Sequence, residues 1–596
     1  MREQSAVFDI ETNGINFEIG NDPDQLRKFH VGSIRPIPGE CAESSTDLQE
    51  FVRNLDEYPR IIGHNIVSFD IPALRRFTNN SNLFTNKGIV DTLILSRLLW
   101  PDRPWGHGLR AWGELLGHPK GDVESFEECT PEMIEYNKND VELNYKVYEY
   151  LQGELGSEPE IWDDAIALEH EFAELFAEQE HYGCAFDIEL AGKLEKKLTG
   201  LIGFCDRVIG PEKYMRIVPE REIHQLFKIN GEPYLNLVKF CDKLGLDIDL
   251  VSGPFSGISW EHPDLNSDKQ QKELLLRLGW KPRSRTPTGE PQIDSSILQV
   301  PIIGEWLQER NGLSNRLSKV QGLVRMLDDH GIIHAGGNTI GTPTARLRHK
   351  RVTNIPKVSV PFGWEFRSLF RARPGKILCG YDASSLELRM LAHYIGDRNF
   401  ISLVLSDDKT NDAHTLARDA AIYAGGTNAT RNTGKTINYA LIYGAMDPKL
   451  GEIIGLGPSA GSKIRSFLMA KIKGYDTFMK RVETEAEKGF LYGLDGRKMF
   501  LRQKRKALNT LIQGGGSIYM KAVAVFVYRL CKPYPEYKKV IDQHDESQVE
   551  IPDTPEDKER FAAIVNEAFA LANEKFELRC PQSPEIKFGY TWAETH

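Results

Sequence analysis

Residues 540–551 read Val540-Ile-Asp-Gln-His-Asp-Glu-Ser-Gln-Val-Glu-Ile551, with the adjacent acids Asp545 and Glu546 between two runs that alternate as strands do. Far upstream, the apolar run that begins at Ile377 ends on a third acid, Asp382. Carboxylates at a hairpin tip and at a strand end are suited to hold two divalent ions about 3.5–4 Å apart, which clamp the attacking and leaving oxygens of a phosphoryl displacement. The pattern therefore indicates phosphoryl-transfer chemistry in the C-terminal part of the chain.

A predicted helix lies between these two segments. Its residues Arg431, Lys435, Tyr439 and Tyr443 recur every four positions and therefore share one face. Two cations followed by aromatic rings can bind a triphosphate at one end and stack on a base at the other. Taken alone, such a stripe is usually a solvated face, but the acids on either side of it in the sequence favour a binding role.

A second group of acids stands in the N-terminal part. Asp9 and Glu11 are two apart on a predicted strand, so both leave the same face. Asp70 begins a helical pattern, and Tyr136 and Asp140 are four apart on one face of another helix. Four acids and a phenol can hold two metal ions and orient a water for attack on a phosphodiester. Any one of these pairs is commonplace, and it is the ordered set that indicates a site.

Composition sets the general class. A chain of 596 residues predicts about three or four domains, and 40% hydrophobic with 27% charged residues is ordinary for a globular protein. No window approaches about 18 uncharged apolar residues, so we expect no membrane partner. Eight cysteines without a Cys-x-x-Cys pair favour a reduced, cytoplasmic setting.

Positive charge is concentrated in two places, although the net charge is −11. Eight Lys or Arg and one acid lie between Thr344 and Arg373, and residues 497–506 contain six basic residues and no acid. Such clusters are typical of a groove that follows phosphates, and a solvated basic face explains either cluster about equally well.

The order of predicted elements divides the chain. Strands and helices alternate over the first 150 residues, with strands at Ser5–Ile10, Val31–Ile34 and Arg60–Gly63 and helices at Ile71–Phe77 and Asp91–Leu99. Long helices follow at Ile161–Asp206, interrupted at Gly183, and again at Ser295–Asp328, 396–490 and Leu508–Leu530. The stretch from Gly210 to Gln292 is mixed, with short strand-like runs at Ile248–Val251 and Ser256–Trp260.

These motifs resemble those of family A DNA polymerases of the polymerase I type, and the overall sequence is most similar to those of replicative polymerases of short-tailed bacteriophages. The resemblance is carried by Asp382-Ala-Ser-Ser-Leu-Glu-Leu-Arg389, Arg431-x3-Lys435-x3-Tyr439-x3-Tyr443-Gly444, His544-Asp545-Glu546, Thr344-Ala-Arg346, Asp412-Ala-His414-Thr415 and Leu508-Asn-Thr-Leu-Ile-Gln513. The N-terminal acids resemble those of DEDDy 3′–5′ exonucleases.

The resemblance implies an α/β and α+β multidomain fold, in which an RNase H-like exonuclease domain precedes a right-hand polymerase. The expected domains are the exonuclease (1–155), connecting helices and thumb (156–345, with a small insertion near 212–258), first palm part (346–396), fingers (397–490) and second palm part (491–596).

The implied function is template-directed DNA polymerisation from a primer 3′ end by two-metal-ion transfer of dNTPs, with 3′–5′ proofreading, in phage-type DNA replication. Asp382 and Asp545 are expected to bind both polymerase metals, with Glu546 supporting the site. The expected nuclease ligands are Asp9, Glu11, Asp70 and Asp140, with Tyr136 beside them. Oxygen-only ligands favour two Mg²⁺ ions per site, with Mn²⁺ as a substitute.

Substrate contacts are implied in the same way. Arg431, Lys435 and His414 are expected to contact the incoming phosphates, Tyr439 to stack on the nucleotide, and Glu387 to exclude a ribose 2′-hydroxyl. The expected DNA contacts are Arg346, Tyr443, Asn509, Gln513 and His544. Two alanines, Ala345 and Ala440, stand where the family usually has glycine.

The expected partners are primer–template DNA, dNTPs and, by resemblance, a replicative helicase or primase. Whether segment 212–258 binds a host processivity factor stays open, and we expect a monomer in the bacterial cytoplasm if the gene is carried by a phage. Three other functions compete with DNA polymerisation: that of a nuclease with a degenerate polymerase-like domain, that of a single-subunit RNA polymerase, and that of a non-catalytic DNA-binding protein. Intact Asp382, Asp545, Arg431 and Lys435, together with Glu387 and the complete N-terminal set, argue against them.

Overall fold

The computed structural model describes residues 4–13, 28–39, 41–156, 160–214, 216–219, 226–251, 258–543 and 545–596. The chain forms two compact units, one of residues 1–188 and 326–596 and the other of residues 189–325. His544 and parts of the 212–258 segment lie outside the described residues.

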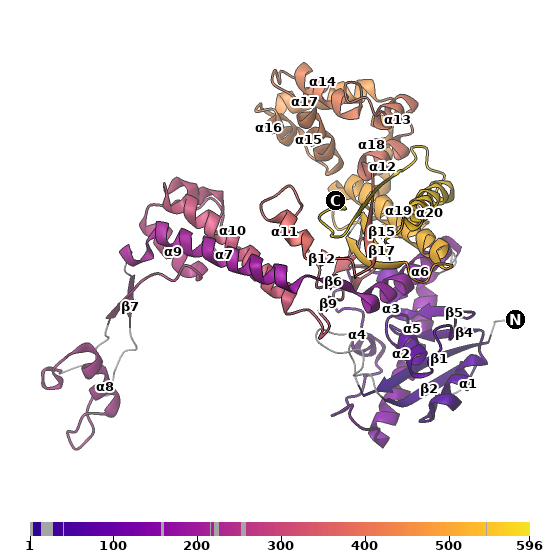
Figure 1. The fold of residues 1–596 in the computed structure, drawn as a ribbon, viewed down its shortest axis with the longest axis horizontal. Coiled ribbons are helices and arrows are strands. Elements are labelled where there is room, and N and C mark those ends of the chain that lie inside the picture. Colours follow the sequence, from indigo (N-terminus) through magenta and orange to yellow (C-terminus); the bar gives the residue numbers. More distant parts are fainter. Residues whose placement is uncertain are drawn as a thin grey trace. The chain divides into compact units, whose positions relative to one another are not determined.

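The N-terminal residues form a five-stranded sheet with helices on both faces (Figure 1). Its elements are β1 (Ser5–Thr12), β2 (Phe29–Ile37), β3 (Glu43–Ser45), α1 (Leu48–Asp56), β4 (Arg60–Gly63), α2 (Asp70–Phe77), β5 (Gly88–Asp91), α3 (Thr92–Leu99), α4 (Leu109–Leu116) and α5 (Pro131–Leu155). The strand order is β3-β2-β1-β4-β5, with β2 antiparallel to β1 and β3, and β4 parallel to β1 and β5. The predicted α/β pattern of this region is confirmed.

Alternation along β1 decides which helix covers which face of this sheet. Phe8 and Ile10 pack with Phe51 of α1 on one face, whereas Val7 packs with Val141 of α5 on the other. Since side chains alternate along a strand, Asp9 and Glu11 belong to the α5 face. The same alternation that forms the core thus delivers two acids to one helix.

A four-stranded antiparallel sheet forms the centre of the C-terminal part. Its strands are β13 (Lys376–Ala383), β16 (Lys538–Gln543), β17 (Glu546–Pro552) and β18 (Pro584–Gly589), in the order β16-β17-β13-β18. One face of β13, represented by Ile377 and Tyr381, enters the large core together with residues of α6 (Glu160–Tyr182), α19 (Ala507–Cys531) and α20 (Pro555–Lys575). Asp382 therefore belongs to the opposite face.

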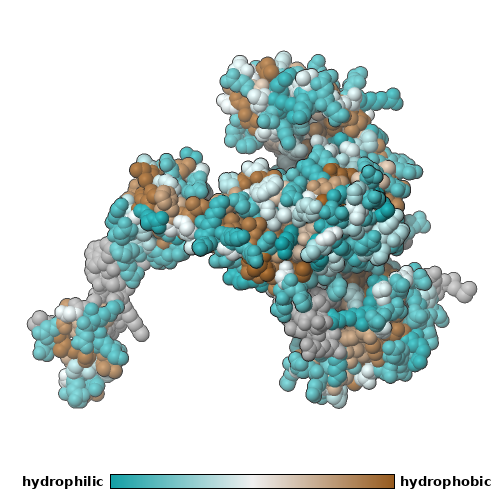
Figure 2. Space-filling view, in the orientation of Figure 1, coloured by the Kyte–Doolittle hydropathy of each residue, from teal (hydrophilic) through white to brown (hydrophobic). Residues whose placement is uncertain are grey.

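Helix α19 is long and apolar enough to match a membrane span by length and composition alone, since 28 residues from Lys504 to Cys531 pass that test. Its most apolar 18-residue stretch is 83% buried inside the fold, where the helix contacts α6, α20 and α12 (Leu386–Ile395). Figure 2 shows mainly hydrophilic residues on the visible face of the molecule. This helix is accordingly a core helix of the C-terminal part.

Helices dominate between β13 and β14, as predicted for 396–490. They are α12 (Leu386–Ile395), α13 (Arg398–Val404), α14 (Ala413–Tyr423), α15 (Arg431–Ile442), α16 (Asp447–Ile453), α17 (Pro458–Lys471) and α18 (Tyr475–Ala486). The remaining elements of this unit are β6 (Cys184–Phe186), β9 (Ile332–Ile333), β10 (Gly337–Asn338), β11 (Arg348–His349), α11 (Gly363–Ser368), β12 (Phe370–Arg371), β14 (Phe490–Tyr492), β15 (Lys498–Phe500) and η5 (Lys504–Lys506).

The second unit has its own core around Leu275, Trp280 and Leu307. It consists of α7 (Ile188–Ile209), η2 (Pro211–Lys213), β7 (Arg216–Pro219), α8 (Leu235–Leu244), η3 (Ile248–Leu250), β8 (Ile258–Glu261), α9 (Asp268–Arg277), η4 (Ser295–Gln299) and α10 (Ile303–Val324). The strand predicted at Ile248–Val251 is wrong, because Asp247 caps a short 3-10 turn there by accepting from the Asp249 amide. The strand predicted at Ser256–Trp260 is found as β8, which begins at Ile258 and pairs with β7.

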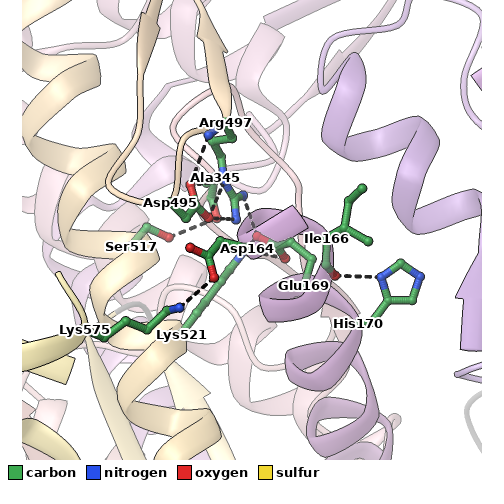
Figure 3. A network of polar contacts seen from close by, with 10 residues as sticks. All are labelled: Asp164, Ile166, Glu169, His170, Ala345, Asp495, Arg497, Ser517, Lys521 and Lys575. Carbon is green, nitrogen blue, oxygen red and sulfur yellow. Dashed lines mark hydrogen bonds and ion pairs between the residues drawn. The ribbon is translucent and has the colours of Figure 1, made fainter. Parts of the chain in front are cut away.

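A buried ion network joins α6, the β14–β15 turn and α19 (Figure 3). Glu169 of α6 accepts from the Lys521 ammonium at 2.6 and 2.8 Å and from Arg497 at 2.5 Å, and Arg497 also binds Asp495. All four side chains are at most 3% exposed. Burial lowers the pKa of Lys521 to about 8, against the opposing charge of Glu169. Two buried cations thus depend on Glu169 for charge compensation.

More than half of the basic residues in the two sequence clusters form ion pairs with acids of the chain. In the first cluster five arginines form ion pairs of 3.2 to 3.6 Å: Arg346–Glu387, Arg351–Glu180, Arg367–Glu546, Arg371–Asp187 and Arg373–Glu550. In the second, three residues are paired: Arg497 as above, Arg502 with Asp102 and Lys504 with Glu487. Acids thus engage these five arginines, and the exposed residues of the first cluster are Arg348, Lys350, Lys357 and the paired Arg371.

Replacing Glu169 with Gln should destabilise the protein strongly. Gln leaves Lys521 without its paired carboxylate and leaves Arg497 with Asp495 alone, and breaking a buried pair in this way costs about 3–5 kcal/mol. Thermal unfolding followed by fluorescence measures the effect. Glu171→Gln on the same helix is the matched control, because its pair with Arg529 is 36% and 49% exposed and such pairs contribute about 1 kcal/mol or less. Equal shifts in the two variants would contradict the assignment.

Candidate active sites

The N-terminal acids come together between β1 and α5. Carboxylate oxygens of Asp9, Glu11 and Asp140 lie within 4.8 Å of one another. Asp9 and Glu11 leave one face of β1, and Asp140 lies on the buried side of α5. Three oxygen ligands at this spacing fit a hard divalent cation such as Mg²⁺.

Asp70 and Asn137 complete the surroundings of Asp9. Asp70, the first residue of α2, is 3% exposed and accepts from the Ile10 amide at 3.2 Å. Asn137 is fully buried on α5 and donates to Asp9 Oδ2 at 2.7 Å. Asp70 is thus held beside Asp9, as the sequence predicted, whereas Asn137 was missed although it directly follows Tyr136.

A lysine that sequence reasoning missed stands among these acids. Lys120, in the loop between α4 and α5, places its Nζ 2.6 Å from Asp140 Oδ2 and 5.0 Å from the ring centroid of Tyr136. Tyr136 and Asp140, four residues apart on α5, therefore share this cation. A loop lysine has no periodic signal, so the sequence offered no means of finding it.

Burial and mutual repulsion shift the acids of this site in one direction. Burial, followed by the charges of Glu11 and Asp140, raises the pKa of Asp9 well above its ordinary value. Burial and Asp140 raise the pKa of Glu11 to about 8. Burial and Asp9 raise the pKa of Asp70 as well. The cluster therefore favours any cation that relieves this repulsion.

The second group of acids lies at one end of the C-terminal sheet. Asp382 is the penultimate residue of β13, and Asp545 lies in the turn just before β17. The register pairs Asp382 with Glu546 on β17 and with Glu585 on β18. Burial, then the charges of Asp545 and Glu546, raise the pKa of Asp382 to about 7. The hairpin predicted from 540–551 thus carries Asp545 to Asp382.

Glu546 is surrounded by donors from four directions. Arg367 donates to both of its oxygens at 3.2 and 3.3 Å, Gln548 Nε2 donates at 2.9 Å, and the Trp592 indole also donates. His596 Nδ1 lies 3.2 Å from the second oxygen. Burial raises the pKa of Glu546, but these donors outweigh it and leave the pKa lowered. These contacts anchor Glu546 at the start of β17.

Helix α15 presents the predicted stripe of cations and aromatic rings. It begins after a capping box formed by Thr430 and Thr433. Arg431 donates to Asp412 through Nε at 2.8 Å, and Lys435 is exposed with its Nζ 6.0 Å from the centroid of Tyr439. One turn later, Tyr443 caps the C-terminus of the helix. The four residues therefore follow one side of α15 as predicted.

Close packing of α14 against α15 places His414 beside this stripe. A Cβ on Gly434 would lie 1.9 Å from the carbonyl oxygen of His414, so only glycine fits at this crossing. Asn438 of α15 donates to the Ala413 carbonyl at 3.0 Å and contacts His414 Nδ1 at 3.1 Å. Burial and the nearby Arg431 lower the pKa of His414, which favours a neutral imidazole.

Glu387 connects the helices to the sheet. It accepts from the Tyr443 hydroxyl at 3.1 Å and from Arg346 at 3.3 Å. Burial raises the pKa of Tyr439, and the charges of Glu387, Asp545 and Asp382 add to the increase. The predicted nucleotide-binding residues of α15 and the predicted metal ligands of the sheet therefore act on one another.

The remaining predicted DNA contacts lie on α19. Asn509 and Gln513 are one turn apart and half-buried, and the buried Asn509 Oδ1 has no partner among the described atoms. Burial raises the pKa of Tyr443, and a hydrogen bond between Tyr443 and Gln513 opposes that increase. The structure thus brings Gln513 to the group around Glu387 and places Asn509 on the same helix.

Ala345 has a backbone geometry that explains the expected glycine. Its φ is 55°, in the left-handed region that favours glycine. It is 2% exposed, and its carbonyl accepts from Ser517 of α19 at 2.9 Å (Figure 3). The next residue, Arg346, is positioned by this turn. Ala440, the other departure, is half-buried on α15 and packs against the large core.

Comparison with known proteins gives one family. The family model described as DNA polymerase family A matches residues 245–594. DNA-directed DNA polymerases of Enterobacteria phage T3 and Escherichia phage T7 are each 26% identical over 99% of this chain and 100% of their own length. The POL domain of Pol1 from M. smegmatis, solved in complex with DNA primer-template and dNTP, matches with a TM-score of 0.73 over 100% of this chain and 96% of that chain. Its 18% identity is a likeness of fold.

The raised pKa of Asp382 predicts pH-dependent metal binding. A carboxyl with a pKa of about 7 is protonated below pH 7, so a divalent ion must displace that proton. Affinity for Mn²⁺ at this site should be about tenfold weaker at pH 6 than on the plateau above pH 8 for one displaced proton. Calorimetric titration of an Asp9→Ala variant measures it, with Asp382→Asn as the control that loses the binding. Affinity independent of pH from 6 to 8 would contradict the prediction.

Proposed function

This chain belongs to DNA polymerase family A, and on that premise we propose that it adds dNTPs to a primer 3′ end by two-metal-ion transfer and removes mispaired ends with its N-terminal site. The observation that carries the polymerase part is the convergence of Asp382 and Asp545 with the α15 stripe around Tyr439. This convergence supports a proposal in which metal ligands and phosphate-binding cations act on one substrate.

The residues present fit divalent metal ions at both sites. Asp382 and Asp545 in the palm, and Asp9, Glu11, Asp70 and Asp140 in the nuclease domain, supply only carboxylate oxygens, which Mg²⁺ prefers. When bound, such ions supply Lewis-acid stabilisation of the attacking and leaving oxygens. Raised pKa values of Asp382 and Glu11 support this role, because repulsion among these acids is what a cation relieves.

The side chains of α14 and α15 act on the triphosphate. Arg431 and Lys435 bind its negative oxygens and stabilise the charge that develops on the transferring group. Asp412 holds the Arg431 guanidinium in place, and His414 adds a neutral imidazole beside it. Tyr439 stacks on the incoming nucleotide one turn further along the helix.

The N-terminal domain is proposed to be an RNase H-like 3′–5′ exonuclease. Its strand order, β3-β2-β1-β4-β5 with β2 antiparallel, supports that fold. The grouping of Asp9, Glu11 and Asp140 within 4.8 Å, with Asp70 and Tyr136 beside them, supports the activity. A mispaired 3′ end stacks poorly at the palm and melts more readily, so it reaches this second site.

Two further proposals concern protein partners and the insertion near 212–258. That a replicative helicase or primase acts with this polymerase is proposed on the resemblance of its motifs to the family alone. For the insertion near 212–258 we propose a structural element that touches duplex DNA. Its own small apolar cluster of Leu226, Leu237 and Cys241 is consistent with an independent structural element.

A labelled primer–template with Mg²⁺ and all four dNTPs tests the two activities. Wild type should extend the primer. Asp545→Ala should lose extension and keep 3′ shortening, because the palm site loses a metal ligand. Asp9→Ala should keep extension and lose shortening. Rates lost in each case should exceed about a hundredfold, or ~2.7 kcal/mol.

Three results would overturn this assignment. Shortening without any extension by wild type would mean that the protein is a nuclease with an inactive polymerase domain. Extension with ribonucleotides as efficient as with dNTPs would favour an RNA polymerase. DNA binding that is retained by Asp382→Ala while neither activity is found in wild type would indicate a non-catalytic DNA-binding protein.

Glu387 should determine the choice of sugar. Its carboxylate is held by Tyr443 and Arg346, and in that position it fills the space that a ribose 2′-hydroxyl needs. Glu387→Ala should raise the kcat/KM for rNTPs relative to dNTPs by about tenfold or more, equivalent to ~1.4 kcal/mol. Glu387→Gln keeps the volume and should retain most of the discrimination. Unchanged discrimination in Glu387→Ala would refute the steric role.

A further inference from the structure

Among the residues that the structure describes, Lys120 is a cation whose charge acts on all three carboxylates of the nuclease cluster. It is placed 2.6 Å from Asp140, and the two side chains are 22% and 3% exposed. Its charge lowers the pKa of Asp9, of Glu11 and of Asp140, in each case against burial, which raises them. A surface lysine that pairs with an exposed acid has neither this burial nor this reach.

The loop that carries Lys120 is fastened to its neighbours by backbone and side-chain contacts. Asn139 of α5 donates to the Pro119 carbonyl at 3.2 Å and pairs with His118 Nε2 at 2.8 Å. The His118 amide bonds the carbonyl of Gly113 at 2.9 Å, where an added Cβ would lie 3.2 Å from the Lys120 amide. The position of Lys120 is therefore built into the α4–α5 connection.

The same ammonium also acts on Tyr136. Burial raises the pKa of Tyr136, and a hydrogen bond from Lys120 opposes that increase. Burial by itself would lower the pKa of Lys120. Asp140 and Tyr136 outweigh this effect and raise the pKa, so the lysine stays charged. One cation is thus shared by the acid and the phenol that stand four residues apart on α5.

Charge balance explains why such a cation is needed. Asp9, Glu11 and Asp140 lie within 4.8 Å of one another in a largely buried site, where like charges disfavour ionisation. Asn137 satisfies one oxygen of Asp9 but carries no charge. Lys120 is the cation in direct contact with Asp140. The other cation that lowers the pKa of Asp140, Arg110, is an exposed residue that pairs with Asp122.

We propose that Lys120 is a positioning residue of the nuclease site, which holds the Asp140 carboxylate beside the Tyr136 side chain. This inference rests on the proposed 3′–5′ exonuclease activity and adds a role for a residue outside the four acids and the phenol of that proposal. Its action is indirect, through Asp140 and Tyr136.

The test uses the full chain carrying Asp382→Ala and Asp545→Ala, so that the nuclease site alone acts and binds metal. Lys120→Met and Lys120→Arg are added to this background, and Lys138→Met is the matched control, because Lys138 lies on α5 in an exposed pair with Glu135. Shortening of a labelled single-stranded oligonucleotide gives kcat and KM, and Mn²⁺ binding without DNA is followed by electron paramagnetic resonance.

We expect Lys120→Met to lower kcat about tenfold or more with KM changed less than about threefold, Lys120→Arg to restore part of kcat, and Lys138→Met to have no effect. Mn²⁺ should bind Lys120→Met as tightly as the background or more tightly, because a competing positive charge is gone. Lower turnover with undiminished metal affinity distinguishes lost positioning from collapse of the site, which would weaken both. Primer extension by Lys120→Met with the palm acids restored should be normal, which shows that the chain folds.

Several results overturn the proposal. Turnover within twofold of the background would make Lys120 an ordinary ion pair. Higher turnover together with tighter Mn²⁺ binding would make it an inhibitor of metal binding. Weaker Mn²⁺ binding with lost turnover would make it a structural residue only. If the background itself fails to shorten the oligonucleotide, the exonuclease proposal fails, and this result is distinct from an effect of Lys120.

Discussion

Like-charged carboxylates are kept close together at two places in this chain, and the repulsion between them must be opposed by the surrounding fold. The cost is visible in the raised pKa values of Glu11 and Asp382, which reach about 8 and about 7. An isolated pair of acids on a surface would separate and remain ionised. Here the strands and helices that carry the acids are locked by hydrophobic cores on their other faces.

The two sites meet this constraint by different means. At the N-terminal site a cation, Lys120, stands among the acids, and a buried amide, Asn137, holds one of them. At the C-terminal site the register of β13 and β17 sets the spacing, and the start of β17 is anchored through Glu546 by Arg367 and its other donors. The charge of Glu546 is compensated by donors within the fold. Asp382 and Asp545 are therefore the acids whose repulsion a metal ion would relieve.

Internal charge pairing also changes the meaning of the basic clusters. Between Thr344 and Arg373, five arginines bind acids that come from distant parts of the chain, among them Glu180 and Glu550. Arg497, counted in the second cluster, is one of the most buried charges and belongs to the network around Glu169. A count of charges along the sequence could not separate these from solvent-exposed cations such as Arg348, because the acids that neutralise them are far away in the sequence.

Local pattern determined much of this protein. Periods of two and of four residues located β1, β4, β13, the 540–551 hairpin and the face of α15, and the motifs on them identified Asp9, Asp140, Asp382 and Arg431 as site residues. The predicted elements are confirmed because their periodicity is present in the sequence, whereas the roles of these site residues stay predictions. The short 3-10 turn at Ile248–Leu250 was mistaken for a strand because three residues are too few for a period to be recognised.

Only the tertiary structure decided which groups meet across elements. Lys120 reaches Asp140 from a loop, Asn137 supports Asp9 from another element, and Arg367 and Trp592 enclose Glu546. Ala345 takes a left-handed conformation that its residue type does not favour, because the turn before Arg346 requires it. The sequence determined the acids, their order and the elements that carry them, whereas their partners were decided by packing, since contacts between distant segments follow from the shared core and leave no periodic trace in the chain.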